Sequence, residues 1–329
     1  MRSIRLGRTG IIVPQNAFGC LPIQRDSKEV AVRLLREAYE GGMRFFDTAR
    51  AYTDSEEKVG EAFDGMRGKV YIATKTAAKT PEGFRKDLET SLKTLRTDYI
   101  DIYQLHNVPQ CYKPGDGTGM YECLVEAKEK GLIRHIGITT HKLAVAQEII
   151  ASGLYETLQY PFSYLSSEKE IDLVRGCIDA DMGFICMKAL AGGLITRSDA
   201  AMAYMTQFDN LVPIWGVQRE NELQEWLSYM DNTPSLTEEI TSYISPGAKP
   251  AARPLIWFTA RQNPSPSGPG SSPWRPAPQN TPTKLLPQMR KVSTPSSPTI
   301  SRQRRPAPAT KTASRPSQRK RPAPPTSPK

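Results

Sequence analysis

The last quarter of this sequence contains no acidic residues, and no part of the chain contains a long apolar run. The chain has 329 residues and 34 Asp and Glu, but none of these acids follows Ser245. No apolar run approaches the length of a membrane-spanning helix, and the first residues lack the apolar core of a signal peptide. We therefore expect a soluble cytoplasmic protein that does not bind membranes.

Cysteine is scarce and irregularly placed. The five cysteines are Cys20, Cys111, Cys123, Cys177 and Cys186. Their odd number argues against a framework of disulfides, and their spacing matches no metal site. We expect free, buried thiols, as is usual in a reducing compartment, and no bound metal. A glycine-rich dinucleotide fingerprint is also missing.

Charge and proline content both change at Ser245. Residues 1–245 hold 28 of the 44 Lys and Arg together with all the acids, for a net charge of −6, whereas residues 246–329 have a net charge of +16. The same last 84 residues hold 20 of the 28 prolines. Such a segment buries too little apolar surface to offset the entropy lost on folding. We predict a folded domain at 1–245 and a disordered, basic, proline-rich tail at 246–329.

Short apolar runs alternate with amphipathic stretches through residues 1–245. Strands are expected at 15–20, 43–46, 69–74, 100–105, 133–138, 157–159, 184–187 and 211–214. Helices are expected at 27–40, 55–63, 81–95, 120–130, 141–151, 167–181, 200–208, 220–229 and 237–244. Two further strands, at 3–6 and 11–13, flank a glycine-containing turn and predict a hairpin. Eight closely spaced strand and helix alternations are typical of a closed (β/α)8 TIM barrel, so we predict an α/β fold of that type.

Polar side chains stand at the ends of three predicted strands. Asp47 follows the run 43–46 and Tyr52 comes five residues later, while Lys75 and His106 end the runs 69–74 and 100–105. The carboxyl ends of the strands in such a barrel open on one face, where the chemistry is done. We expect these four side chains to meet in one pocket.

The same residues lie in motifs that resemble the aldo-keto reductase superfamily. The matching stretches are FFDTARAYTDSEEKVGEAF, IATKT, YIDIYQLHN and GLIRHIGITTH, within a resemblance that covers about residues 4–232. The catalytic Asp, Tyr, Lys and His of the family correspond to Asp47, Tyr52, Lys75 and His106. The resemblance implies an oxidoreductase that reduces an aldehyde or ketone with hydride from a nicotinamide cofactor. It also implies that the hairpin closes the bottom of the barrel.

Reduction of a carbonyl group needs a proton donor, because negative charge develops on the carbonyl oxygen. A tyrosine with its usual pKa of about 10 suits neutral pH poorly, but a neighbouring ammonium lowers that pKa. We predict that Tyr52 is the proton donor, that Lys75 lowers its pKa, and that Asp47 is the counter-ion of Lys75. His106 would donate a second hydrogen bond to the carbonyl oxygen. Positioned acid catalysis of this kind speeds a reaction by roughly 10² to 10⁴.

The resemblance implies a cofactor site at the later strand ends. Its residues would be Thr139, Thr140, Gln159, Met187, Lys188, Leu190, Gly192, Gly216, Gln218 and Arg219. Thr139 and Thr140 replace the Ser-Asn pair that usually holds the nicotinamide carboxamide. Met187 stands where an aromatic ring often stacks on the nicotinamide, and it offers a softer surface. The loops that contain Gly192 and Gly216 match those that contact the phosphates.

The identity of the cofactor and of the substrate stays open. Glu220 and Glu222 follow Arg219, whereas many members that use NADPH place a cation after this loop to meet the ribose phosphate. Arg219 alone could serve, so the sequence permits NADPH or NADH. Substrate specificity is expected to come from the loops at 20–24, 108–118 and 162–165. Their residues do not indicate a particular carbonyl compound. The oligomeric state is equally unspecified.

Within the superfamily, the chain most resembles reductases with a C-terminal ferredoxin-like extension that holds iron-sulfur clusters. Such an extension needs a C-x-x-C-x-x-C type run, but no cysteine follows Cys186. The abrupt loss of acids with a rise in Arg and Pro is what an out-of-frame reading of GC-rich DNA produces. We hypothesise that residues 246–329 are a frameshift product and that electron transfer through such clusters is lost.

Two other functions stay open. The barrel could act without catalysis, as a redox-sensing or regulatory subunit, as some relatives do. The tail could bind polyanions through its basic residues, which include Arg302, Arg304, Arg305, Arg319, Lys320 and Arg321. Basic tails bind nucleic acid weakly and without specificity, so the expected partner is a small carbonyl substrate.

Overall fold

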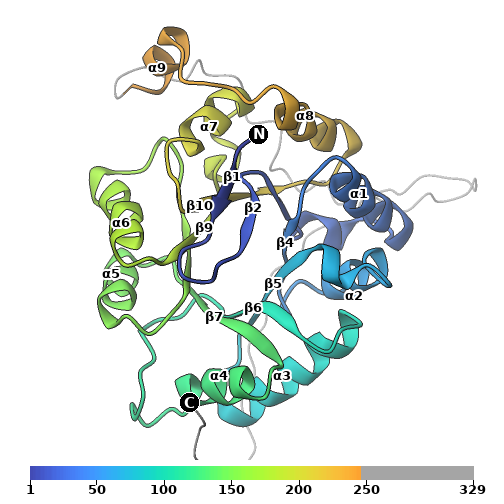
Figure 1. The fold of residues 1–329 in the computed structure, drawn as a ribbon, viewed down its shortest axis with the longest axis vertical. Helices are drawn as coiled ribbons and strands as arrows, with labels where there is room; N and C mark the ends of the chain where they lie inside the picture. Colours follow the sequence, from blue (N-terminus) through green and yellow to red (C-terminus); the bar gives the residue numbers. More distant parts are fainter. Residues whose placement is uncertain (246–329) are drawn as a thin grey trace, which may run out of the picture. The chain divides into compact units, whose positions relative to one another are not determined.

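A closed barrel of parallel strands is the central feature of residues 1–245, the part of the chain that the computed structural model describes (Figure 1). Around the barrel the strands follow the order β10, β3, β4, β5, β6, β7, β8, β9, and all neighbouring pairs are parallel. They are β3 (Ala17–Gly19), β4 (Phe45–Asp47), β5 (Tyr71–Thr76), β6 (Ile100–Leu105), β7 (Ile133–Thr139), β8 (Thr157–Pro161), β9 (Gly183–Met187) and β10 (Leu211–Gly216). The predicted (β/α)8 barrel is confirmed.

Helices surround the ring of strands (Figure 1). They are α1 (Lys28–Glu40), α2 (Ser55–Ala62), α3 (Pro81–Thr94), α4 (Met120–Glu129), α5 (Leu143–Ser152), α6 (Glu168–Asp179), α7 (Ser198–Met205), α8 (Glu220–Asp231) and α9 (Glu238–Ile244). Short 3-10 turns occur at η1 (Pro22–Arg25), η2 (Arg67–Lys69) and η3 (Ala191–Gly193). Within residues 1–245, no helix has the length and apolar character needed to cross a bilayer.

Several helices begin where side chains next to their first turn can accept backbone N–H groups. The Ser27 hydroxyl accepts from the Val30 N–H at 3.3 Å, and the Thr80 hydroxyl accepts from the Gly83 N–H at 3.2 Å. Such caps satisfy donors that have no partner inside the helix. Pro81, at the first position of α3, has no N–H to satisfy and a preset φ. These local signals explain why the predicted starts of α1 and α3 are correct to within one residue.

A hairpin of β1 (Ser3–Arg5) and β2 (Ile12–Pro14) lies across one end of the barrel, as the resemblance implied (Figure 1). Its apolar side chains, Ile4 and Val13 among them, join an apolar cluster formed by residues inside the barrel. Gly7 at the turn has a φ of +50°, and a Cβ there would come within 2.4 Å of the Gly183 N atom. Only glycine allows this close approach of the two backbones.

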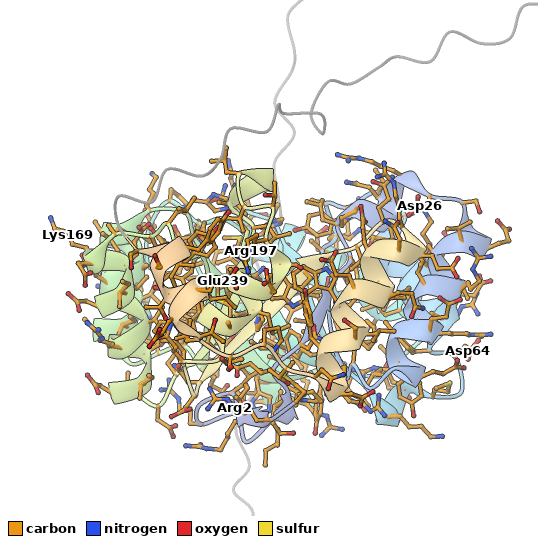
Figure 2. The ribbon with its side chains drawn as sticks, turned by 90° about the horizontal axis from the view of Figure 1, so that it is seen from above. Arg2, Asp26, Asp64, Lys169, Arg197 and Glu239 are labelled. Atoms are coloured by element: carbon orange, nitrogen blue, oxygen red, sulfur yellow. The ribbon has the colours of Figure 1, made fainter. Side chains whose placement is uncertain are left out.

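The two ends of the barrel carry different residues. Arg2, next to the hairpin, lies at one edge of the molecule, and Asp26, in the segment that follows β3, lies at the opposite edge (Figure 2). Because all the strands of the barrel are parallel, the loops that follow them open at the end opposite the hairpin. That end is where the site residues predicted from strand ends must lie.

Several strand bounds differ from those predicted. The strand expected at 69–74 is β5 (Tyr71–Thr76), because the preceding residues form η2, in which the Arg67 side chain donates to the Val70 carbonyl oxygen at 3.0 Å. Lys75 therefore lies within the strand and not beyond its end. The strands β8 and β10 run two residues further than expected, since pairing with β9 and β3 continues to Pro161 and Gly216.

The predictions for residues 246–329 fall outside the described residues. These are the disordered tail, its origin as a frameshift product, and its polyanion-binding residues. The five predicted free thiols lie within the described part, and all of them are buried and unpaired with one another.

Candidate active site

Asp47 and Lys75 form a buried ion pair at the open end of the barrel. Lys75 Nζ donates to Asp47 Oδ2 at 2.6 Å and to the Thr48 carbonyl oxygen at 2.7 Å. The side chains of Asp47 and Lys75 are 2% and 1% exposed. Ionised groups without water need a partner of opposite charge, because burial removes their hydration. The two residues predicted as cation and counter-ion are thus in direct contact.

Two glutamine amides complete the surroundings of Asp47. Gln104 Nε2 lies 3.4 Å from Asp47 Oδ1 and donates to Gln159 Oε1 at 2.9 Å. Gln159 Nε2 lies 3.4 Å from Asp47 Oδ2. Both glutamines are buried. The carboxylate is therefore held from three strands, since Lys75, Gln104 and Gln159 belong to β5, β6 and β8.

Tyr52 and His106 lie beside this ion pair. The Tyr52 and His106 rings meet edge to face, with centroids 5.9 Å apart and an interplanar angle of 80°. Lys75 Nζ is 5.2 Å from the centroid of the Tyr52 ring. The structure thus brings together all four residues predicted from strand ends, although only Lys75 and Asp47 belong to strands.

The pKa of Tyr52 differs in direction from the sequence-based prediction. Burial raises the pKa of this phenol above its ordinary value, and the positive charge of Lys75, which lowers it, is too weak to reverse that effect. The negative charge of Asp47 adds to the increase. Lys75 lowers the pKa of Tyr52 as predicted, but the loss of hydration, which the prediction did not include, outweighs this effect. The phenol keeps its proton at neutral pH.

The other titratable groups have definite charge states. Burial, together with the positive charges of Lys75 and His141, lowers the pKa of His106 to about 4, so its imidazole is neutral at neutral pH. Burial raises the pKa of Asp47 despite the opposing effect of Lys75. Burial lowers the pKa of Lys75, but the charges of Asp47 and Tyr52 outweigh it and leave that pKa raised. The ammonium therefore stays charged.

Thr139 and Thr140, where β7 ends, hold the loop that follows β6. Thr139 Oγ1 accepts from the Asn107 N–H at 2.6 Å, and Thr140 Oγ1 donates to the Val108 carbonyl oxygen at 3.0 Å. The Thr140 N–H donates to the Gln159 carbonyl oxygen at 3.2 Å. Thr140 has therefore used its hydroxyl hydrogen, whereas the Thr139 hydroxyl serves as an acceptor.

The loop after β9 combines an exposed cation with a backbone that turns sharply. Met187 is half-buried against the apolar cluster inside the barrel, and the next residue, Lys188, is exposed. Lys188, Ala191 and Gly192 have positive φ angles of 57°, 48° and 70°. Leu190 is half-buried and Gly192 is exposed. Within this turn the N–H groups of Ala191 and Gly193 donate to the carbonyl oxygens of Lys188 and Leu190, at 2.7 Å and 2.9 Å.

Acidic side chains occupy the start of α8. Gly216, at the end of β10, is exposed. Glu222 Oε2 accepts from the N–H groups of Gln218 at 2.9 Å and Arg219 at 3.1 Å, and Glu222 Oε1 lies 3.8 Å from Arg219 Nη1. The Gln218 side chain donates to Asp26 Oδ1 at 3.5 Å. The helix end that would favour an anion already holds a carboxylate of its own chain.

A family model matches the part of the chain that forms this site. Residues 17–226 match the Aldo/keto reductase family, and this span includes the whole barrel from β3 to β10. The chain belongs to the aldo/keto reductase family. The predicted enzyme class, a reductase that depends on NADPH or NADH, is confirmed by this membership. The roles of individual residues in this reductase are a separate question.

Curated relatives are of the same kind. The reductase is 24% identical over 278 residues to the oxidoreductase YqkF of Bacillus subtilis, a match that covers 78% of this chain and 86% of YqkF. It is 32% identical over 183 residues to the aldo-keto reductase YhdN of the same organism, covering 51% of this chain and about half, 54%, of YhdN. It is 36% identical over 199 residues to the methylglyoxal reductase DkgB of Salmonella typhimurium, covering 55% of this chain and 71% of DkgB.

Solved structures share the fold. An aldo-keto reductase of Bacillus halodurans has a TM-score of 0.65 and 22% identity, covering 74% of this chain and 95% of its own. An aldo-keto reductase of Klebsiella pneumoniae, solved in complex with NADPH, has a TM-score of 0.63 and 22% identity, covering 74% and 93%. The barrel of this reductase is therefore the one that aldo-keto reductases use.

Sequence reasoning missed four side chains near the site: Cys20, Asp26, Glu56 and Gln104. Gln104 carried a signal, because it lies two residues beyond Ile102 and so on the same inward side of β6, where a polar group is unusual. Cys20 is fully buried next to Asp47, and burial raises the pKa of its thiol. Nothing local marked Asp26 or Glu56, since Gln218, the partner of Asp26, and Thr74 and Ser91, which donate to Glu56, come from other segments.

Proposed function

We propose that this reductase converts an aldehyde or ketone to an alcohol, with Tyr52 as the proton donor and NADPH or NADH as the hydride donor. The observation that carries the proposal is the contact of a protonated phenol with a buried, charged Lys75 and a neutral His106. The methylglyoxal reductase among the relatives supports a small carbonyl substrate. The NADPH complex of a structural neighbour supports the choice of cofactor.

Each polar group of the site has a distinct proposed role. Tyr52 gives its proton to the carbonyl oxygen as negative charge develops there, and the Lys75 ammonium stabilises the phenolate that is left. Asp47 keeps Lys75 charged at 2.6 Å. His106, neutral at neutral pH, donates one N–H to the same carbonyl oxygen. The amides of Gln104 and Gln159 keep Asp47 in place.

The residues at the later strand ends fit a nicotinamide dinucleotide. The cofactor supplies the hydride when it is bound. Thr139 has a hydroxyl hydrogen for the carboxamide, and the exposed cation Lys188 suits a diphosphate. Gly216 is exposed, so a ligand could reach its backbone. These contacts suit NADPH and NADH equally.

The test uses the full chain and a panel of small aldehydes and ketones. Oxidation of NADPH and NADH would be followed by the absorbance of the reduced nicotinamide, for the wild-type protein and for Tyr52→Phe. Tyr52→Phe removes only the hydroxyl, so we expect kcat to fall by about 100-fold or more while the cofactor Kd is retained. Tyr121→Phe is the matched control, because the Tyr121 hydroxyl contacts the Leu154 carbonyl oxygen far from the site, and it should leave kcat unchanged.

The result separates the proposal from the regulatory alternative. Turnover that depends on the Tyr52 hydroxyl supports the enzyme. Cofactor binding without turnover of any carbonyl compound would instead favour a redox-sensing or regulatory barrel. Equal kcat values for Tyr52→Phe and the wild type would contradict the role of Tyr52 as proton donor.

A further inference from the structure

A second buried carboxylate lies next to the proposed catalytic groups. Glu56, the second residue of α2, is 1% exposed. Glu56 Oε1 accepts from Thr74 Oγ1 at 2.6 Å and from Ser91 Oγ at 2.8 Å. Glu56 Oε2 accepts from Thr94 Oγ1 at 3.1 Å and from the Arg50 guanidinium. A carboxylate this deeply buried is stable only because these four donors replace its hydration.

These partners connect Glu56 to the segments that carry Tyr52 and Lys75. Thr74 directly precedes Lys75 in β5, and Arg50 lies two residues before Tyr52. The Arg50 N–H donates to the Lys75 carbonyl oxygen at 2.9 Å. The Arg50 guanidinium also reaches the carbonyl oxygen of Thr53, the residue after Tyr52, at 3.5 Å. Arg50 therefore precedes Tyr52, contacts β5 and the residue after Tyr52, and is held by Glu56.

We propose that Glu56 is a positioning residue for Tyr52, because its ion pair with Arg50 holds the loop 48–54 in the place where the phenol lies against Lys75. This inference rests on the proposed function. Neither Glu56 nor Arg50 contacts the reacting groups, so the effect acts through the loop. A displacement of a catalytic group by about 1 Å can lower the rate by about 100-fold. Loss of the ion pair should therefore reduce kcat and leave cofactor binding intact.

The chemistry of glutamine makes the ion pair separable from the rest of the cluster. In Glu56→Gln the amide oxygen can still accept from Thr74 and Ser91, and the amide nitrogen can donate to the Thr94 hydroxyl. The amide nitrogen cannot accept from Arg50, so the contact to the loop is the one that is lost. Arg50→Lys provides the conservative rescue, since it keeps a positive charge facing Glu56.

Steady-state kinetics of the full-chain variants form the first test. We expect Glu56→Gln and Arg50→Gln each to lower kcat by about 10- to 100-fold without changing the Kd of NADPH or NADH. Because both changes break the Glu56–Arg50 contact and Arg50→Gln also removes the contact to Thr53, the double variant should lose no more than Arg50→Gln alone. Arg50→Lys should retain most of the kcat. Arg85→Gln is the control, since it breaks an exposed ion pair with Glu126 on α3 and α4 and should leave kcat unchanged.

Hydrogen exchange forms the second test and does not depend on turnover. The N–H groups of Thr48, Arg50 and Tyr52 donate to the carbonyl oxygens of Ala73, Lys75 and Ala49, so exchange of the 48–54 peptide reports the order of the loop. We expect faster exchange in this peptide in Glu56→Gln, with unchanged exchange in the loops at 188–193 and 216–219. Unchanged exchange at 48–54 would overturn the positioning role.

The two tests distinguish failure of this inference from failure of the proposed function. If the wild-type protein reduces no carbonyl compound, the proposed function fails, and the exchange data alone decide whether Glu56 orders the loop. If Glu56→Gln lowers thermal stability but leaves kcat and the 48–54 exchange unchanged, Glu56 has a structural role only and the inference is overturned.

Discussion

Burial and neighbouring charges together set the charge of each residue in the proposed active site. Tyr52 and His106 are both kept neutral by loss of hydration, whereas Lys75 stays charged because Asp47 is in contact with it. A neutral phenol can donate its proton to a carbonyl oxygen, and a neutral imidazole still has one N–H that can donate a hydrogen bond to it. The protonation states of Tyr52 and His106 therefore match those that the proposed reduction of a carbonyl group requires.

The lowered pKa of His106 predicts a pH dependence of stability. The pKa falls from an ordinary 6.5 to about 4 in the folded protein, so below pH 6.5 the unfolded chain binds the proton more readily. Stability should fall as the pH drops from 6.5 to 4, by up to about 3 kcal/mol from this residue. His106→Asn should lack this part of the decline. Urea unfolding of both proteins between pH 7 and 4 measures the difference, and identical pH dependence would contradict the buried neutral state.

At the scale of elements, different loops and helix starts supply different parts of the proposed site. The loop after β4 carries Tyr52, the loop after β9 offers Lys188 and a sharply turned backbone, and α8 begins with Glu222 bound to its own first turn. The start of α8 is thus occupied by negative charge, at the end of the barrel where loops after the last two strands commonly bind phosphate.

Removal of the carboxylate at the start of α8 should change cofactor preference. In Glu222→Gln, the negative charge beside the N–H groups of Gln218 and Arg219 is gone, so an anion is tolerated better there. We expect the Kd of NADPH to fall relative to that of NADH by about 3- to 10-fold. Glu220→Gln, an exposed acid in the same turn, is the matched control and should have a smaller effect. Fluorescence titration with NADPH and NADH measures the two Kd values for each variant. An unchanged ratio of these Kd values in Glu222→Gln would show that α8 does not determine cofactor preference.

In the barrel as a whole, the proposed active site and the β1–β2 hairpin lie at opposite ends. The hairpin packs its apolar side chains against the interior of the barrel, while the loops that follow the strands carry the polar groups. Arg2 near the hairpin and Asp26 near the open end mark this separation (Figure 2). We therefore expect the hairpin end to contribute to stability and the open end to hold the proposed active site.

A pair of glycine substitutions tests the closure of the barrel. In Gly7→Ala, a Cβ would meet backbone atoms of residues 181–183 at 2.4–2.5 Å, in addition to the strain of a φ of +50°. We expect a loss of about 3 kcal/mol or more in the free energy of unfolding. Gly10→Ala has a φ of +71° but no atom within 4 Å of the added Cβ, so it should cost only about 1 kcal/mol. Equal losses in urea unfolding would show that the close backbone approach has no consequence.

Much of the fold could be predicted because its signals are local. Ser27 and Thr80 cap the helices that follow them, and the runs at 100–105 and 133–138 are strands in the structure almost as predicted. Strand ends were harder to predict. Pairing with a neighbour that is distant in the sequence extends β8 and β10, and no residue within those strands announces it.

The sequence by itself determined the α/β barrel, the family, and the four polar residues that belong together. It did so because strand and helix patterns and motif residues are properties of a few neighbouring positions. Only the tertiary structure decided the direction of the Tyr52 pKa, the amide contacts of Asp47, and the contacts of Glu56 and Asp26. Burial and electrostatic energy sum over groups from several strands and helices, and those groups become neighbours only when the barrel closes.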